Sequence, residues 1–149
     1  MEVHTVSKGD LNSIHALVKE VATIDVLPLL NTQGKNEFLT RVLGDIESTF
    51  DTSSYYSVKV LVEGEIVGYG AIRDGNYLTH LFVSKQSQGL GVGHFILSHL
   101  LGSTDAAEVS LRSSVNAMSF YEKHGFVATG SESKFNGIRF VPMTLQIAP

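Results

Sequence analysis

The sequence predicts a single α/β domain, and three observations support this fold class. The chain has 149 residues with 43% hydrophobic content, enough for one buried core, and it shows no internal repeat or interdomain linker. Two stretches with helical apolar spacing precede three stretches in which apolar and polar residues alternate. A glycine-rich segment then leads from the last alternating stretch into a further apolar helix. We therefore treat residues 1–149 as one domain.

The N-terminal part of the chain is typical of one short strand followed by two helices. Ser7 and Asp10 have the spacing of a capping box, which marks a helix start, and apolar residues then recur at helical spacing. Pro28 interrupts this pattern, and the polar residues after it predict a loop. The expected elements are a strand at residues 3–6, a helix at 8–22, a loop at 31–34 and a helix at 38–46.

The middle of the chain predicts a three-stranded antiparallel meander. Apolar side chains alternate with polar ones over Tyr56–Val62, as expected for a half-buried strand. Glycine-containing turns at residues 63–65 and 74–76 separate this strand from two more, at residues 66–73 and 77–83. The third strand leads directly into the glycine-rich segment.

The C-terminal part predicts two more helices that alternate with strands. A helix with a strongly apolar composition begins after Gly91. Asn136 followed by Gly137 is typical of a tight turn between two antiparallel strands. The remaining expected elements are a strand at residues 109–111, a helix at 117–124, and strands at 126–129 and 138–147.

Residues 83–93 say most about function. An apolar strand ends at Val83, glycines follow at positions 89, 91 and 93, and a helix then begins. Glycine lets the backbone approach a ligand, and the first amides of a helix are unpaired and lie at the positive end of its dipole. A pyrophosphate fits such a segment, and a turn without a ligand is the alternative. The G-x-G-x-G spacing without Gly-Lys-Ser/Thr excludes a Walker loop and a dinucleotide fingerprint.

Two motifs resemble those of the GCN5-related N-acetyltransferase (GNAT) superfamily. Gln88-x-x-Gly91-x-Gly93 resembles the Gln/Arg-x-x-Gly-x-Gly/Ala signature with which that family binds the pyrophosphate of acetyl-coenzyme A. Residues 114–126 are similar to its Asn/Ala, then Phe-Tyr-Glu-Lys-x-Gly-Phe, segment. The resemblance covers about residues 56–143. It implies a mixed, curved sheet of six to seven strands, flanked by about four helices, whose fourth and fifth strands separate around the cofactor.

The same resemblance implies an acetyl-coenzyme A dependent N-acetyltransferase. Its acceptor would be a primary amine of a small molecule or an exposed amino group, acetylated by direct transfer. The main chain of residues 89–93 would hold the pyrophosphate, and that of residues 81–83 the pantetheine arm. Many relatives have an asparagine upstream of Asn116, at the place of Ser114, so both residues are candidates. The expected cofactor-binding residues are Leu81, Phe82, Val83, Gln88, Gly89, Leu90, Gly91, Val92, Gly93, His94, Ser114, Asn116 and Tyr121.

Two residues are candidates for proton transfer. By resemblance Tyr121 is the general acid that protonates the departing thiolate, and a phenol is protonated at neutral pH. A core aromatic is the other interpretation of Tyr121. Many relatives carry a glutamate base on the fourth strand, where this chain has Thr79 and His80. His80 is therefore the candidate catalytic base, with a structural histidine as the equal alternative.

Composition narrows the possibilities further. The absence of cysteine excludes disulfides, thiolate metal sites and a cysteine nucleophile, and no histidine pairing indicates a metal site. A net charge of −4 without a basic run argues against a surface for nucleic acid or membrane. No leader or long apolar segment is evident, so we expect a cytoplasmic protein, either a monomer or a homodimer.

Two other functions are alternatives to an acetyltransferase. One is an acyl-coenzyme A sensor, or a partner subunit, that binds the cofactor without turnover, and retention of Tyr121 weighs against it. The other is a hydrolase, for which the chain lacks a G-x-S-x-G elbow. No spacing identifies the acceptor amine or an acyl-chain preference beyond acetyl.

Overall fold

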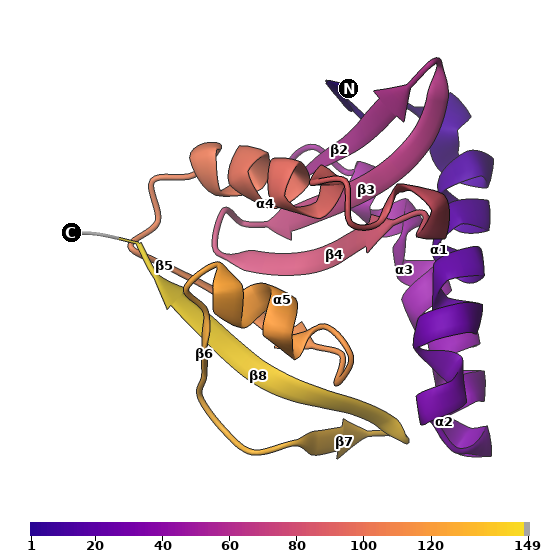
Figure 1. The fold of residues 1–149 in the computed structure, drawn as a ribbon, viewed down its shortest axis with the longest axis vertical. Coiled ribbons are helices and arrows are strands. Elements are labelled where there is room, and N and C mark those ends of the chain that lie inside the picture. The colour runs from indigo at the N-terminus through magenta and orange to yellow at the C-terminus, as the bar shows by residue number, and fades with distance from the viewer. Residues whose placement is uncertain (148–149) are drawn as a thin grey trace.

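The strands pair in the order β1-β2-β3-β4-β5-β8-β6, and β7 pairs with β8 (Figure 1). This computed structural model describes residues 1–147. Among these residues β4 and β5 form the one parallel pair, and the other pairs are antiparallel. The strands are β1 (Glu2–Thr5), β2 (Tyr55–Val62), β3 (Glu65–Arg73), β4 (Tyr77–Val83), β5 (Glu108–Ser113), β6 (Val127–Ala128), β7 (Ser133–Phe135) and β8 (Ile138–Gln146).

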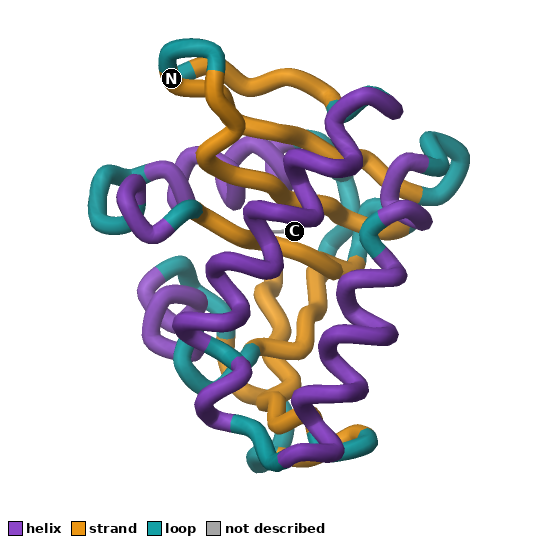
Figure 2. Tube along the Cα trace, turned by 90° about the vertical axis from the view of Figure 1, so that its right-hand side faces the viewer, coloured by secondary structure: helices purple, strands orange, loops and turns teal. Residues whose placement is uncertain are grey.

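Helices cover both faces of the β2–β4 part of the sheet. Tyr69 of β3 packs with Ile14 of α1 on one face, while Gly68 and Gly70 of the same strand let Ile96 of α4 approach the other. Seen from the right-hand side of Figure 1, the helical segments near α1 and α2 lie in front of the strands (Figure 2). The α-helices are α1 (Leu11–Asp25), α2 (Thr32–Glu37), α3 (Leu43–Asp45), α4 (Val92–Gly102) and α5 (Met118–Lys123).

The predicted fold class is confirmed, and the tight turns explain the one strand that was not expected. The turns Glu63–Gly64, Asp74–Gly75 and Asn136–Gly137 each place two successive residues at positive φ, from 50° to 85°. That geometry suits two-residue hairpin loops. The chain therefore folds back on itself directly at Asn136–Gly137 and forms β7 before the turn, so the predicted turn joins β7, not residues 126–129, to β8.

The predicted loop at residues 31–34 is wrong. Asn31 is the N-cap of α2, and its Oδ1 accepts a hydrogen bond of 2.8 Å from the main-chain nitrogen of Gly34. Polar residues that suggest a loop therefore form a cap and a first helical turn. Helical backbone continues through α3 to Phe50 by way of a π-helical turn at Phe38–Val42 and a 3-10 turn at Glu47–Phe50.

The sheet opens between β4 and β5. These strands pair only through Tyr77 with Ser110 and Leu78 with Leu111. The β3–β4 register shifts at the same level, because Ala71 pairs with His80 while Ile72 pairs with Leu78, which leaves Thr79 as the extra residue of a bulge. A bulge bends its strand and increases the local twist. It therefore turns the end of β4 away from β5.

The β7–β8 hairpin docks on α2 at the far end of this opening. Gly34 is buried against Gly137, so a Cβ at Gly34 would overlap the carbonyl group of Gly137 and lie 3.1 Å from the Cβ of Leu30. Asn136 donates from Nδ2 to Glu37 Oε1 over 3.3 Å. A glycine at position 34 thus lets the hairpin and the helix come into main-chain contact.

We expect Gly34→Ala to lower the free energy of unfolding by about 1–3 kcal/mol, because the main chain of Gly137 cannot move away from the added Cβ without distortion. Gly44 is the matched control, since it is also helical but a Cβ there meets nothing within 4 Å. Gly44→Ala should raise the free energy of unfolding by about 0.5–1 kcal/mol. Urea denaturation followed by circular dichroism measures both. A Gly34→Ala variant as stable as the native chain would contradict the tight contact.

Candidate active site

A cavity of about 330 Å³ lies at the opening of the sheet. The end of β4 and the glycine-rich segment form one side, and α5 with the residues before it forms the other. Of the expected site residues, those that line this cleft are Leu81, Phe82, Val83, Gln88, Gly89, Gly93, Ser114, Asn116 and Tyr121. The opening therefore brings together two motifs that are about thirty residues apart in the sequence.

The end of β4 presents unpaired main-chain groups to the cleft. The nitrogen of Ser84 donates to the oxygen of Val67 over 2.9 Å, so this pair is hydrogen-bonded. Hydrogen-bonded and non-hydrogen-bonded pairs alternate along antiparallel strands. The amides and carbonyls of Leu81 and Val83 consequently point away from β3, on the side where β5 has diverged. Within residues 1–147 the amide and carbonyl of Leu81 and the amide of Val83 are available to pair with an extended ligand, as a neighbouring strand would, whereas the carbonyl oxygen of Val83 accepts a hydrogen bond from Gln88 Nε2.

The glycine-rich segment shapes the N-terminus of α4. Gly89 and Gly91 have φ angles of 82° and 85°, and Gly91 is the N-cap of the helix. The first amides of α4 have no intrahelical partner, and the first turn contains no acidic residue. A Cβ at Gly93 would lie 3.1 Å from Cε1 of Phe120, so glycine also lets α4 pack against α5. These features fit a pyrophosphate bound by the main chain.

Three expected residues of this segment lie outside the cavity lining. Val92 is buried in the core, so only its main chain is free to meet a ligand, whereas the Leu90 side chain is 71% exposed. His94 is exposed beside the cleft and contacts His124. Their roles in cofactor binding stay predictions.

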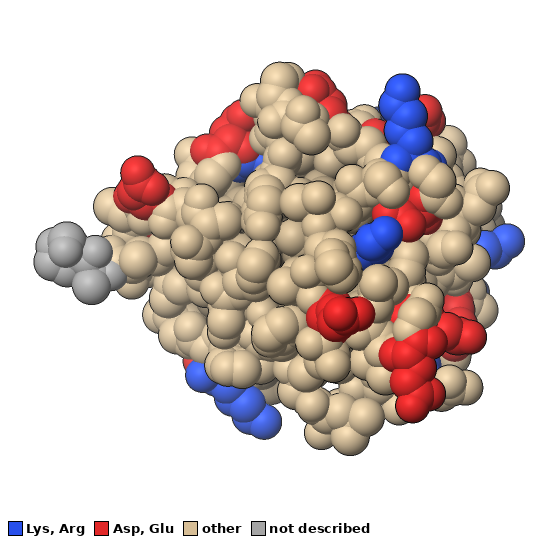
Figure 3. Space-filling model, turned by 90° about the horizontal axis from the view of Figure 1, so that it is seen from above, with Lys and Arg blue, Asp and Glu red and all other residues tan. Residues whose placement is uncertain are grey.

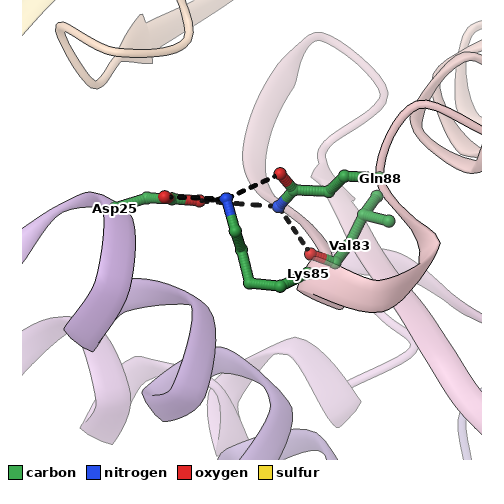
Figure 4. A network of polar contacts seen from close by, with 4 residues as sticks. All are labelled: Asp25, Val83, Lys85 and Gln88. Atoms are coloured by element: carbon green, nitrogen blue, oxygen red, sulfur yellow. Dashed lines mark hydrogen bonds and ion pairs between the residues drawn. The ribbon is translucent and has the colours of Figure 1, made fainter.

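Gln88 belongs to a polar network that joins the loop to the end of α1 (Figure 4). Lys85 Nζ lies 2.9 Å from Asp25 Oδ1 and donates to Gln88 Oε1 over 3.0 Å. Gln88 Nε2 in turn donates to the carbonyl oxygen of Val83 over 3.0 Å. The network holds the loop against α1 and orients the Gln88 amide toward β4. Its expected contact with the pyrophosphate stays a prediction.

Tyr121 is a core residue that also lines the cleft. Its side chain is 8% exposed, and its ring packs edge-on against Phe126 with the centroids 5.6 Å apart. Burial raises the pKa of Tyr121 above its ordinary value of 10.0. Among residues 1–147 no group hydrogen-bonds to its hydroxyl, which leaves that proton for a ligand. The two interpretations of Tyr121 are therefore compatible.

His80 lies apart from Tyr121, outside the cleft lining. It is 7% exposed and packs between Tyr69 and Phe82, on the face of the sheet that α1 covers. Its Nδ1 lies 2.9 Å from Thr79 Oγ1. Burial lowers the pKa of His80 to about 4, and a hydrogen bond with the main chain of Val42 opposes this shift. The ring is thus neutral at pH 7, but the structure does not bring it to the cavity wall.

The structure adds lining residues that sequence reasoning missed. Val21, Asp25 and Val26 come from the end of α1, and Phe120 from α5. Phe120 could have been found, because it stands in the second motif beside Tyr121. The α1 residues carry no local signal, since only packing brings that helix to the end of β4.

Comparison with known proteins assigns the family. The model of the acetyltransferase (GNAT) domain matches residues 26–147. The chain therefore belongs to the GNAT acetyltransferase family, whose cofactor is acetyl-coenzyme A. It is an N-acetyltransferase by class. A search of curated protein sequences found no significant match.

Solved structures of low sequence identity share the fold. A GCN5-related N-acetyltransferase from Rhodopseudomonas palustris has a TM-score of 0.73 at 20% identity, covering 98% of this chain and 95% of its own. The PaiA N-acetyltransferase from Thermoplasma acidophilum, in complex with coenzyme A, has a TM-score of 0.76 at 15% identity, with 98% of each chain covered. An aminoglycoside 6'-N-acetyltransferase complexed with coenzyme A has a TM-score of 0.74 at 15% identity, covering 100% of this chain and 98% of its own.

The described residues give little support to other kinds of site. The described part of the chain holds no group of three or more His, Asp or Glu side chains suited to a metal ion. No helix within residues 1–147 has both the length and the apolar character needed to cross a membrane. On the face shown in Figure 3, Lys and Arg side chains lie apart from one another and form no basic patch. The expectations about nucleic acid, location and oligomeric state stay predictions.

The buried His80 predicts a stability that depends on pH. Its pKa is about 4 in the folded chain and about 6.5 when exposed, so the unfolded chain binds more protons between these values. Protonation of His80 should therefore leave the free energy of unfolding unchanged above pH 6.5 and lower it by up to about 3 kcal/mol as the pH drops to 4. His80→Gln should remove this part of the pH dependence in urea titrations.

His4→Gln is the matched control, because His4 is exposed on β1. It should leave the pH dependence as it is in the native chain. Identical slopes for the native chain and His80→Gln between pH 6.5 and 4 would show that His80 is not held neutral.

Proposed function

We propose that this protein transfers the acetyl group of acetyl-coenzyme A directly to a primary amine, on a small molecule or an exposed amino group. The observation that carries the proposal is that one cleft combines the edge of β4, the N-terminus of α4 and the hydroxyl of Tyr121, which has no hydrogen-bond partner within residues 1–147. The cofactor supplies the acyl group as a reactive thioester. Everything else in the reaction is binding, orientation and proton transfer by this chain.

Two main-chain segments would hold the cofactor. The amides of residues 89–93 lie at the N-terminus of α4, the positive end of its dipole, and suit the pyrophosphate. The outward amide and carbonyl of Leu81 and the outward amide of Val83 suit the amides of the pantetheine arm. A fixed amide of this strand that faces the thioester oxygen would stabilise charge there by roughly 3 kcal/mol. Ser114 and Asn116 line the opposite side of the cleft.

Tyr121 would protonate the departing thiolate. Its hydroxyl is protonated at neutral pH because burial raises its pKa, and it has no competing partner within residues 1–147. For the base, the neutral ring of His80 is in the correct protonation state, and we retain it as the candidate, acting through water. Its place beneath α1 supports the structural role at least as well.

The similar structures indicate two classes of acceptor. One is an aminoglycoside 6'-N-acetyltransferase, and another is the ribosomal-protein-S18-alanine N-acetyltransferase from Escherichia coli. A small-molecule amine and a protein amino group are therefore both reasonable acceptors. A panel of polyamines, amino acids, aminoglycosides and peptides, assayed by release of free thiol from acetyl-coenzyme A, tests the function. Tight cofactor binding without thiol release from any amine would favour the sensor instead.

Tyr121→Phe should lower kcat by about 10²- to 10⁴-fold, the usual contribution of a general acid, while the Kd for acetyl-coenzyme A stays close to the native value. Phenylalanine keeps the ring that packs on Phe126, so the fold should be retained. Tyr77→Phe is the matched control, because Tyr77 lies outside the cleft. Equal turnover in the native chain and Tyr121→Phe would exclude the acid role.

The pH profile follows from the same pKa. Because burial raises the pKa of Tyr121 above 10.0, the acid stays protonated while the acceptor amine loses its proton. The kcat/KM should therefore rise with pH and not fall from loss of this acid below about pH 10. A decline between pH 7 and 9 that Tyr121→Phe abolishes would contradict the raised pKa.

A further inference from the structure

Two histidines link α4 to α5 beside the cleft. His94, in the first turn of α4, has its Nδ1 2.8 Å from Nε2 of His124. His124 has its own Nδ1 2.8 Å from the main-chain oxygen of Phe120. Gly93, next to His94, and Phe120 both line the cleft. The pair therefore flanks the end of the cleft at which the pyrophosphate is expected.

The hydrogen-bond chain determines which nitrogens carry protons. A carbonyl oxygen only accepts, so His124 Nδ1 must carry a hydrogen that it donates to Phe120. In a neutral His124 the Nε2 atom is then bare and accepts, so His94 Nδ1 must be its donor. His94 Nε2 is consequently bare in the neutral pair. A bare nitrogen repels a phosphate oxygen, since both atoms are acceptors.

One added proton reverses this. If the proton resides on His94, both nitrogens of that ring carry hydrogen, and Nε2 becomes a donor. If it resides on His124, the His124 Nε2 donates to His94 Nδ1, which forces the His94 hydrogen onto Nε2. In either arrangement the exposed ring presents an N–H from Nε2 and the pair carries one positive charge. Histidine is the side-chain type whose charge most readily changes near neutral pH.

We propose that His94 binds a phosphate of the cofactor when the pair holds this extra proton, and that His124 is the positioning residue that sets its tautomer. The inference rests on the proposed function, because it requires the cofactor in this cleft. It adds a side-chain ligand, dependent on pH, to a site otherwise made of main-chain amides. Binding should therefore be coupled to proton uptake.

The surroundings leave the extra charge available to a ligand. His124 is the titratable side chain that contacts His94 from α5, and the neighbouring Glu122 and Lys123 are exposed. Within the described residues no carboxylate pairs with either histidine. Lys85, the cation of the preceding loop, is already engaged by Asp25. A phosphate is thus the natural partner for a protonated pair.

Isothermal titration calorimetry with coenzyme A at pH 6 and pH 8 tests the proposal. The native chain should bind about tenfold more tightly at pH 6, the effect of one charge-assisted hydrogen bond, and should take up protons on binding. Proton uptake is measured from buffers that differ in ionisation heat. His94→Gln should bind with a smaller dependence on pH and a smaller proton uptake, whereas His4→Gln should behave as the native chain.

A comparison of coenzyme A with 3'-dephospho-coenzyme A shows which phosphate His94 contacts. In 3'-dephospho-coenzyme A the monoester, whose own proton titrates near about pH 6, is missing. If the difference between the native chain and His94→Gln persists with this ligand, the pyrophosphate is the partner of His94. If it disappears, the 3'-phosphate is the partner. Either result supports the proposal, and equal proton uptake by the native chain and His94→Gln with both ligands overturns it.

The role of His124 has a spectroscopic readout. Nitrogen chemical shifts of the His94 ring at pH 8 should show Nδ1–H in the native chain and Nε2–H in His124→Phe, where no acceptor remains. An unchanged tautomer would refute the positioning role. Absence of any coenzyme A binding at either pH would instead contradict the proposed function. Saturable binding without the pH effect would reject this inference alone.

Discussion

The divergence of β4 from β5 is the feature on which the rest of the site depends. Two strands that paired along their whole length would satisfy each other's amides and carbonyls and leave nothing for a ligand. Here pairing stops after Leu78, at the level of the bulge at Thr79. Main-chain groups at Leu81 and Val83 are thereby left at a strand edge inside the molecule. The cleft is the consequence of a local irregularity in strand pairing.

An opened sheet has to be held together by contacts outside it, and this chain has them at both ends of the cleft. At one end Gly34 and Gly137 bring the last hairpin onto α2 through main-chain contact. At the other, α4 meets α5 through the close approach of Gly93 to Phe120 and through the histidine pair. The contacts near α4 also involve the segment that suits a phosphate. Binding a cofactor there is therefore expected to tighten the two halves of the sheet.

Much of the fold could be predicted because its signals are local. The turns at Glu63–Gly64 and Asp74–Gly75, the strand at β2 and the glycine turn before α4 depend on neighbouring residues, and each was confirmed. The alternation along β2 holds at the buried Val58 and Val60 but not at Ser57, which is buried, or Val62, which is exposed. Asn31 shows where local reasoning fails, since a polar residue that caps a helix has the same composition as a loop. The cap is recognised only once its hydrogen bond to Gly34 exists.

The residues of the candidate site also fall into two groups, those that local sequence identifies and those that only packing places. The sequence alone determined that a glycine-rich turn precedes α4 and that Tyr121 stands in a segment that resembles a family motif, because both are encoded in runs of adjacent residues. Tertiary structure alone decided that His80 lies beneath α1, and that Asp25 lines the cleft. These placements depend on the bulge, on which face of β4 each residue occupies, and on how distant elements pack. No single stretch of sequence contains that information, because it arises from contacts between segments that meet only in the folded chain.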